Sequence, residues 1–104
     1  MTMELTDLTV ERMQPLLGTT FRLDAPNGQS YPIQLVEVTK GVDQHVSSGM
    51  KRDQFSLVFT GPADPFFPQA TYPMHHEAFE KPLAIFIVPI ARLQSGFRYE
   101  AVFT

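Results

Sequence analysis

The sequence predicts a mainly β domain, either a small six-stranded antiparallel meander barrel or a two-sheet sandwich, with a short N-terminal helix. Three observations lead to this fold class. The chain has 104 residues, the size of one domain, and 43% are apolar, so we expect residues 1–104 to share a single core. Nine prolines and six glycines divide the chain into short segments that suit strands and turns. There is no room between the expected strands for the helix that a parallel crossover needs, so the sheet is predicted to be antiparallel.

A short helix is expected first, in the stretch Thr6–Gly18. Asp7 or Thr9 can cap its N-terminus, and Pro15 and Gly18 can end it. Beyond this stretch the apolar period changes from helical to alternating, which indicates strands. The helix residues expected to face the body of the domain are Leu8, Val10, Met13, Leu16 and Leu17.

A hairpin is predicted next. Thr19–Asp24 and Ser30–Lys40 alternate apolar and polar residues, and Ala25–Gly28 between them ("APNG") has the composition of a tight turn. In the second of these strands the apolar phase shifts at Val36, which indicates a β-bulge or a bend. The aperiodic stretch Gly41–Arg52 is expected to be a loop.

The other four strands are expected to follow in sequential hairpins. Phe55, Leu57 and Phe59 alternate on one face of the first, and Pro62–Pro68 ("PADPFFP") forms a rigid connection after it. Apolar inner faces and one capping helix favour a closed or nearly closed barrel over an open sheet. The predicted ranges are Asp53–Gly61, Gln69–Glu77, Glu80–Arg92 and Phe97–Thr104.

Composition and charge exclude several classes of protein. Eight basic and eleven acidic residues are spread along the chain, so there is no basic stripe and nucleic acid is not an expected partner. Because the chain has no cysteine, disulfides, thiolate zinc sites and cysteine nucleophiles are excluded. The first residues lack the pattern of a signal peptide, and the longest apolar run, Leu83–Ala91, is far shorter than the roughly twenty residues that span a bilayer. We therefore expect a cytoplasmic protein with no membrane insertion.

The stretch Thr71–Phe79 ("TYPMHHEAF") contains two of the three histidines in the chain. Neighbouring residues of a strand point to opposite faces, so His75 and His76 are not expected to bind one metal ion together. We expect no metal and no cofactor here, and place both histidines on the surface or at a strand edge. A partner-facing or pH-sensitive role is the alternative, because histidine titrates near neutrality.

Three phenylalanines are further candidates for contact with a partner. Phe66 and Phe67 lie in the proline-rich connection, where they either close one end of the barrel or place one ring on the surface. Phe86 lies in Leu83–Ala91, a run that is apolar on both faces of a strand. Its outer face needs a cover, and the N-terminal helix is favoured over a second copy or another protein.

Four segments of the sequence form a recognisable order: "LLGTTFRL" (Leu16–Leu23), "FSLVFTGPADPFFPQATY" (Phe55–Tyr72), "FIVPI" (Phe86–Ile90) and "RYEAVF" (Arg98–Phe103). Together they resemble a family of small bacterial domains of unknown function, and the resemblance covers nearly the whole chain. Ala70 stands where that family often has glycine, and the histidine after Tyr72 is doubled here, which argues against a fixed histidine ligand. The resemblance implies genes near phage tail-collar-like or tail-fibre-like proteins, hence an accessory role, and no catalytic residues.

The sequence thus favours a non-enzymatic binding or assembly module with a filled interior. We expect it to contact protein through one or more of the candidate residues Phe66, Phe67, His75, His76 and Phe86. Ser47 and Ser48 lie near His45, but no G-x-S-x-G elbow surrounds either serine, so no catalytic residue is expected. The alternative is a small-molecule-binding protein or small enzyme with a site at the barrel mouth near His75 and His76. That alternative requires a hollow of several hundred cubic ångströms.

Overall fold

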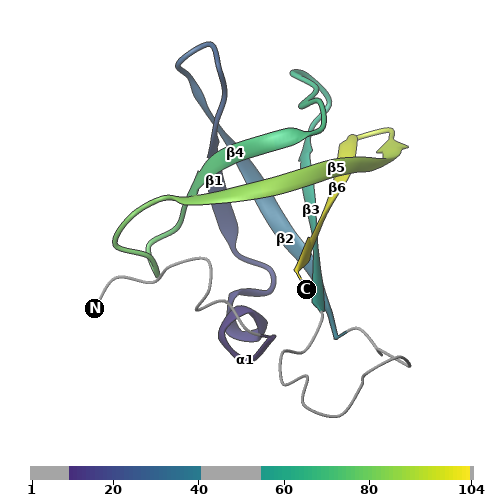
Figure 1. Cartoon of the computed structure of the whole chain (residues 1–104). Helices are drawn as coiled ribbons and strands as arrows, with labels where there is room; N and C mark the ends of the chain where they lie inside the picture. The colour runs from purple at the N-terminus through teal and green to yellow at the C-terminus, as the bar shows by residue number, and fades with distance from the viewer. Residues whose placement is uncertain (1–9, 41–54, 104) are drawn as a thin grey trace.

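The computed structural model describes residues 10–40 and 55–103, which form six antiparallel strands closed into a barrel, with a short helical segment at one end (Figure 1). The predicted fold class is therefore confirmed, in its barrel form. The elements are α1 (Val10–Met13), a 3₁₀ turn η2 (Gln14–Leu16), β1 (Thr20–Asp24), β2 (Ser30–Lys40), β3 (Phe55–Pro62), β4 (Ala70–His75), β5 (Leu83–Leu93) and β6 (Gly96–Phe103).

The connectivity departs from a simple meander at one point. The strands follow one another around the barrel in the order β1-β2-β3-β6-β5-β4, so β3 pairs with β6 and β4 closes the barrel against β1. The prediction that β3 and β4 form a hairpin is wrong. The connection contains three prolines, Pro62, Pro65 and Pro68, which have no backbone N–H to donate to the hydrogen bonds of a tight hairpin. The loop between β3 and β4 instead carries the chain across one end of the barrel.

The first hairpin forms as predicted. The β1–β2 turn is closed by the Ala25 N–H, which donates to the Gln29 carbonyl at 2.8 Å, and by the Gly28 N–H, which donates to the Ala25 carbonyl at 3.0 Å. Gly28 has a φ of 85°, a left-handed conformation that glycine adopts without strain. The register between β2 and β3 shifts between Leu35 and Glu37, which confirms the predicted bulge.

The barrel interior is filled by side chains. Residues that alternate along each strand point inward, and the largest of them have almost no exposed surface. Phe21 and Phe59 meet edge to face with ring centroids 5.3 Å apart, so aromatic rings occupy the centre. The fully buried side chains of greatest volume are Tyr99, Phe21, Phe59, Phe67, Met13, Leu23, Ile33, Leu35, Leu57, Met74, Ile85 and Ile87.

The helical segment covers one end of the barrel. It is shorter than predicted within the described residues, and Met13 anchors it with a fully buried side chain while Val10 and Leu16 pack against the core. Leu17 was expected to face the body but is 43% exposed, because the chain becomes extended there (φ −58°, ψ 131°) as it leaves the 3₁₀ turn. The other predictions for this region and the next loop concern residues outside the described ranges. They are the capping residues Asp7 and Thr9, Leu8, and the loop at 41–52 with His45, Ser47 and Ser48.

The helix does not cover the outer face of β5, which corrects the favoured sequence prediction. The α1 segment packs beside β2 at the end of the barrel opposite the β3–β4 loop (Figure 1). Leu83, Ile85 and Ile87 point inward as predicted, whereas Phe86 points outward and is 50% exposed. Of the two covers considered for this face, contact with another chain therefore stays a prediction.

Candidate functional site

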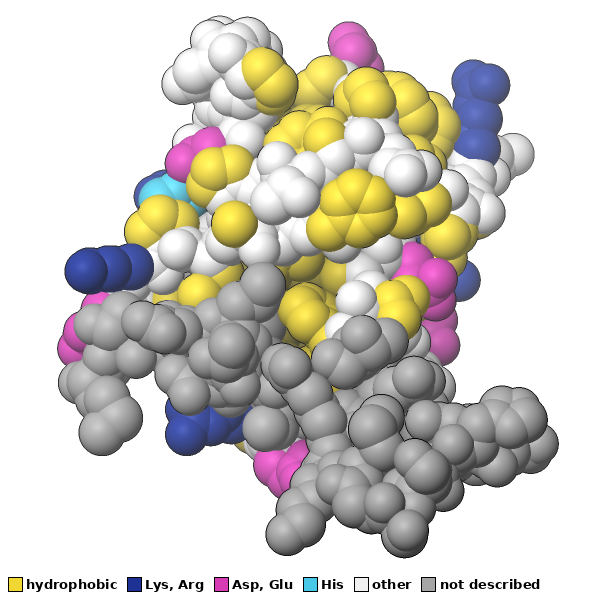
Figure 2. Space-filling view, viewed as in Figure 1, with side chains coloured by type: hydrophobic (Ala, Val, Ile, Leu, Met, Phe, Trp, Pro, Cys, Tyr) yellow, Lys and Arg dark blue, Asp and Glu magenta, His cyan; other side chains and the backbone are white. Residues whose placement is uncertain are grey.

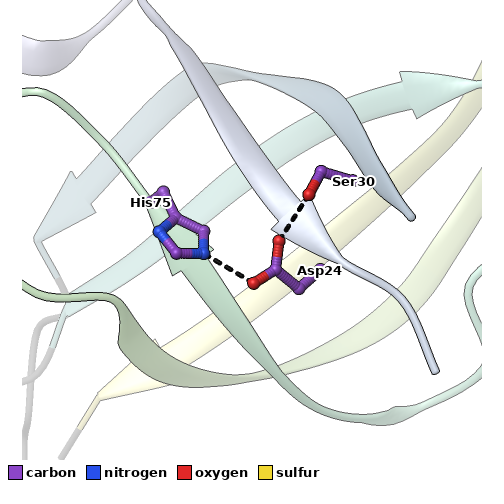
Figure 3. Close-up of polar contacts among 3 residues, drawn as sticks. All are labelled: Asp24, Ser30 and His75. Carbon is purple, nitrogen blue, oxygen red and sulfur yellow. Dashed lines mark hydrogen bonds and ion pairs between the residues drawn. The ribbon is translucent and has the colours of Figure 1, made fainter. Parts of the chain in front are cut away.

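Asp24, Ser30 and His75 form a polar cluster on the outer surface of the barrel (Figure 3). Asp24 ends β1 and Ser30 begins β2, and the two residues are paired across the hairpin, where the Ser30 hydroxyl donates to Asp24 Oδ1 at 2.7 Å. His75 ends β4, and its Nε2 lies 2.6 Å from Asp24 Oδ2. Since an ionised carboxylate only accepts hydrogen bonds, His75 Nε2 is the donor.

The order of these three groups differs from that of a nucleophilic triad. In a triad the histidine lies between the hydroxyl and the carboxylate and takes the hydroxyl proton. Here Asp24 lies between Ser30 and His75, and the serine proton points at the carboxylate (Figure 3). The Ser30 hydroxyl and then the His75 imidazole hold the pKa of Asp24 below its usual value. This arrangement stabilises an anion and does not activate the hydroxyl.

His76 makes a different set of contacts from its neighbour. The Ala78 N–H donates to His76 Nδ1 at 2.9 Å, and His76 Nε2 lies 2.9 Å from Thr19 Oγ1. Because the Thr19 hydroxyl itself donates to the Leu16 carbonyl, its oxygen accepts the Nε2 proton. The ring also packs on Phe21, with centroids 4.5 Å apart. Both ring nitrogens are thus occupied, in a neutral Nε2–H tautomer.

The two histidines hold β4 to the β1 side of the barrel from two directions. Only Arg22 and Leu23 of β1 pair with β4, opposite His75 and Met74, so this seam is the shortest in the barrel. His75 bonds across it to Asp24, and His76 bonds to Thr19 just before β1. Their partners differ, so the imidazoles do not converge on a common point, and residues 10–40 and 55–103 contain no cluster of three or more metal-ligating side chains.

A pocket of about 570 Å³ lies beside these histidines. It is on the outer side of β1 and β2 next to the β4–β5 loop, and not inside the barrel. Its polar lining includes Arg22, Ser30, His75 and Glu77, and rings such as Phe79 form its apolar part. We call it the histidine pocket. The barrel-mouth alternative required an interior hollow, which the packed core does not provide, but this pocket has the volume of a ligand site.

The two phenylalanines of the β3–β4 loop have separate positions. Phe67 is 2% exposed and packs on Tyr99 and Tyr72, so it closes the barrel end. Phe66 is 47% exposed and rests edge-on against Phe97, with centroids 4.9 Å apart. Phe67 therefore closes the barrel end, and Phe66 lies on the surface, where it is the one of the two rings that a partner can reach.

A second apolar surface lies on the outside of β5 and β6. Phe86 points outward from β5, and Val88 beside it is half-buried. Val88 pairs with Glu100 in antiparallel register, so Val102 of β6, which is 59% exposed, follows on the side of Phe86. Apolar side chains gather over this face in Figure 2. We call Phe86, Val88 and Val102 the outer patch.

The sequence could have revealed only part of this arrangement. Asp24 and Ser30 flank the predicted "APNG" turn, and a hairpin places such residues opposite each other. The Asp24–His75 and Thr19–His76 contacts depend on the pairing of β1 with β4, strands far apart in the chain. No local pattern signals that pairing.

In the part of the chain that the structure describes, no helix has the length and apolar character to cross a bilayer. Neither a curated protein nor a solved structure matches the chain. One family model matches residues 8–103, and its description is Domain of unknown function (DUF6916). This match covers nearly the whole sequence, so the chain belongs to the DUF6916 family.

Proposed function

We propose that this protein is a non-enzymatic binding module that acts by contacting protein, either a second copy of itself or another chain. The observation that carries the proposal is the exposure of two large rings on well-packed backing. Phe66 is 47% and Phe86 50% exposed, whereas seven other aromatic side chains of the same core are at most 7% exposed. Full burial of an exposed phenylalanine side chain is worth about 1.5–3 kcal/mol, and roughly half of that remains for a ring that is already half-buried, so each ring would act as an anchor.

The backing of Phe66 supports this role. The ring rests on Phe97, and its neighbour Phe67 is fixed because the Phe67 N–H donates to the Tyr99 hydroxyl at 3.0 Å. Side chains that are held in place before binding lose little conformational entropy on binding, which favours affinity. His75 and His76 are less suited to contact, because both ring nitrogens of His76 and the Nε2 of His75 already bond within the chain.

The family resemblance extends the proposal to a process. On this resemblance we propose that the protein is bacterial and cytoplasmic, and that it is an accessory to a phage-tail-like or surface structure. The proposal assigns it no catalytic residue, no metal and no nucleic-acid partner.

A second candidate function is the binding of a small molecule in the histidine pocket. The pocket volume of about 570 Å³ favours it, together with the mixture of Arg22, Ser30 and His75 on one side and apolar rings on the other. Against a reaction at this site, the Ser30 proton is committed to Asp24 and the His76 nitrogens are committed to Ala78 and Thr19.

Affinity purification of the tagged protein from its native host distinguishes the two candidates. The wild type and the variants F66A, F86A and H75A are compared for co-purifying proteins and for extracted small molecules. The proposal predicts one stoichiometric protein, or a second copy of the chain, whose recovery falls in F66A or F86A and persists in H75A. A metabolite or metal that is lost only in H75A would overturn it in favour of the histidine pocket.

A further inference from the structure

An apolar groove lies at the end of the barrel opposite α1. The β1–β2 turn and the β3–β4 loop both project from this end (Figure 1), and the groove between them has a volume of about 470 Å³. We call it the proline groove. Three prolines and three aromatic rings line most of it: Pro26, Pro65, Pro68, Phe66, Phe67 and Tyr72.

The walls of the proline groove are held by hydrogen bonds to the barrel. The Phe67 N–H donates to the Tyr99 hydroxyl at 3.0 Å, and the Tyr72 hydroxyl donates to the Pro68 carbonyl at 2.6 Å. On the opposite wall, Asn27 is fixed within its turn, because its amide accepts from the Gln29 N–H and donates to the Tyr31 hydroxyl. The groove is therefore formed before any ligand arrives.

The chemistry of the lining limits what can occupy the groove. None of its residues carries a charge at neutral pH, since burial raises the pKa of Tyr72 and keeps its phenol protonated. Pro26, Pro65 and Pro68 have no N–H to donate. An anion would find neither a cation nor a cluster of N–H groups, so the occupant is not recognised by a negative charge and binds by its apolar surface.

Known modes of peptide recognition differ in the groups that the receptor has to provide. Strand addition needs a free sheet edge, and among the described residues each of the six strands is already paired on both sides. Capture of an acidic motif or a chain terminus needs arginines or N–H groups, which this lining lacks. A polyproline II segment needs neither, because its backbone stays hydrated while its proline rings pack on aromatic side chains. An amphipathic helix also enters apolar grooves, but aromatic-lined grooves are the type that polyproline II segments occupy, and Phe66, Phe67 and Tyr72 line this one.

We propose that the proline groove binds a proline-containing segment of a partner protein in the polyproline II conformation. The inference rests on the proposed protein-binding function and names the surface and the chemistry of the partner. Phe66 is the ring that the segment contacts most, because it is 47% exposed at the rim, whereas Phe67 and Tyr72 form the floor.

A phage-displayed library of random dodecapeptides, panned against the purified protein, tests the proposal. Recovered peptides are synthesised, and their dissociation constants are measured by fluorescence anisotropy for the wild type, F66A and F86A. The two variants are matched, since each removes a phenylalanine that is about half exposed, and only Phe66 lines the groove. Each variant is first shown to be folded by its near-native chemical denaturation curve.

The expected result is enrichment of peptides with two or more prolines that bind F66A at least about tenfold more weakly and F86A as well as the wild type. Proline-free peptides at the groove, proline peptides unaffected by F66A, or no enrichment would each overturn the inference. Peptides lost only in F86A would also overturn it, but would leave the proposed protein-binding function in place at the outer patch.

Discussion

His75 at the end of β4 bonds to Asp24 at the end of β1, with Nε2 and Oδ2 2.6 Å apart, across the shortest seam of the barrel. The Ser30 hydroxyl approaches the same carboxylate from the neighbouring strand. A closed barrel needs every seam to hold, because an open seam exposes two unpaired strand edges. The two adjacent histidines therefore both help to close the barrel. His75 bonds to Asp24 on the outer surface, and His76 bonds to Thr19 at the barrel end.

The ionised Asp24 carboxylate is predicted to make stability depend on acid pH. Its pKa is lowered by Ser30 and then by His75, so its contribution is complete above the pKa of the unfolded chain, about 4, and is lost as the pH falls through the lower folded pKa. Urea unfolding of wild type and D24N from pH 6 to about 2 checks this. The wild type should be the more stable above about pH 5, and the difference should shrink toward zero in acid.

The variant S30A provides a control for the cause of that pKa shift. It removes the hydroxyl donor and leaves His75 in place, so the folded pKa of Asp24 should rise toward its unfolded value. The acid loss of stability should then be smaller than in the wild type and should end at a higher pH. A difference between wild type and D24N that is the same at every pH would contradict the role given to the carboxylate.

His76 is predicted to be structural. The substitution H76A removes the part-buried hydrogen bond to Thr19 and the ring contact with Phe21, and it leaves the Ala78 N–H without its acceptor. The free energy of unfolding should therefore fall by about 1–3 kcal/mol. Asparagine can accept from the same N–H in an Asx turn, so H76N should recover part of the loss in urea denaturation. Equal stability of H76A and the wild type would show that the contacts of the imidazole do not stabilise the barrel.

Tyr99 is predicted to hold the β3–β4 loop through its hydroxyl. In Y99F the buried Phe67 N–H has no acceptor, and an unsatisfied buried donor costs about 1–3 kcal/mol of stability. Y31F is the matched control, because the Tyr31 hydroxyl bonds within an exposed turn, and its effect should be within about 0.5 kcal/mol. Thermal or urea unfolding of both variants decides the comparison.

The same tyrosine predicts a loss of stability in alkali. Burial raises the pKa of Tyr99, the Phe67 N–H that donates to its hydroxyl lowers it in part, and the neighbouring Tyr72 raises it, with a net rise. Its contribution is therefore complete below the unfolded pKa, about 10, and falls as the pH rises toward the folded value. Y99F should lose less stability than the wild type between pH 9 and about 11, with the remaining dependence due to Tyr72. Parallel pH profiles would contradict this.

Gly96 is predicted to tolerate no side chain. It begins β6 with a φ of 156°, and a Cβ there would lie 1.9 Å from the Gly61 carbonyl oxygen, so one of the two backbones has to move. We expect G96A to lose about 3 kcal/mol or more. Gly28 also has a positive φ but has open space around it, so G28A should lose only about 1–2 kcal/mol. Equal losses in urea unfolding would contradict the close approach of β3 and β6.

Much of the fold follows from local patterns in the sequence. Alternation placed Phe21, Leu23, Leu57 and Phe59 inward, and the phase shift at Val36 located the bulge in β2. These features depend on side-chain period and turn chemistry, which act over a few residues. The turn and the strands were predictable for that reason, and apolar inner faces favoured a barrel over an open sheet.

The order of the strands was not predictable in the same way. The loop that crosses from β3 to β4 uses prolines, which indicate rigidity but not direction, and the pairing of β1 with β4 joins residues about fifty positions apart. The cover of Phe86 was also mispredicted, since the helix could have packed on either the end or the side of the barrel. The contacts of His75 and His76 depend on this long-range order, so they could not be predicted from the sequence either.

Site-specific photo-crosslinking in the native host tests the central claim most directly, namely that the protein acts by binding protein through its exposed phenylalanines. A benzoylphenylalanine is placed at Phe66, at Phe86 and, as a control, at Arg22 on the rim of the histidine pocket. The account predicts a crosslink to one protein from position 66 or 86 and none from position 22. A crosslink confined to position 22, or no protein crosslink from any of the three, would contradict it.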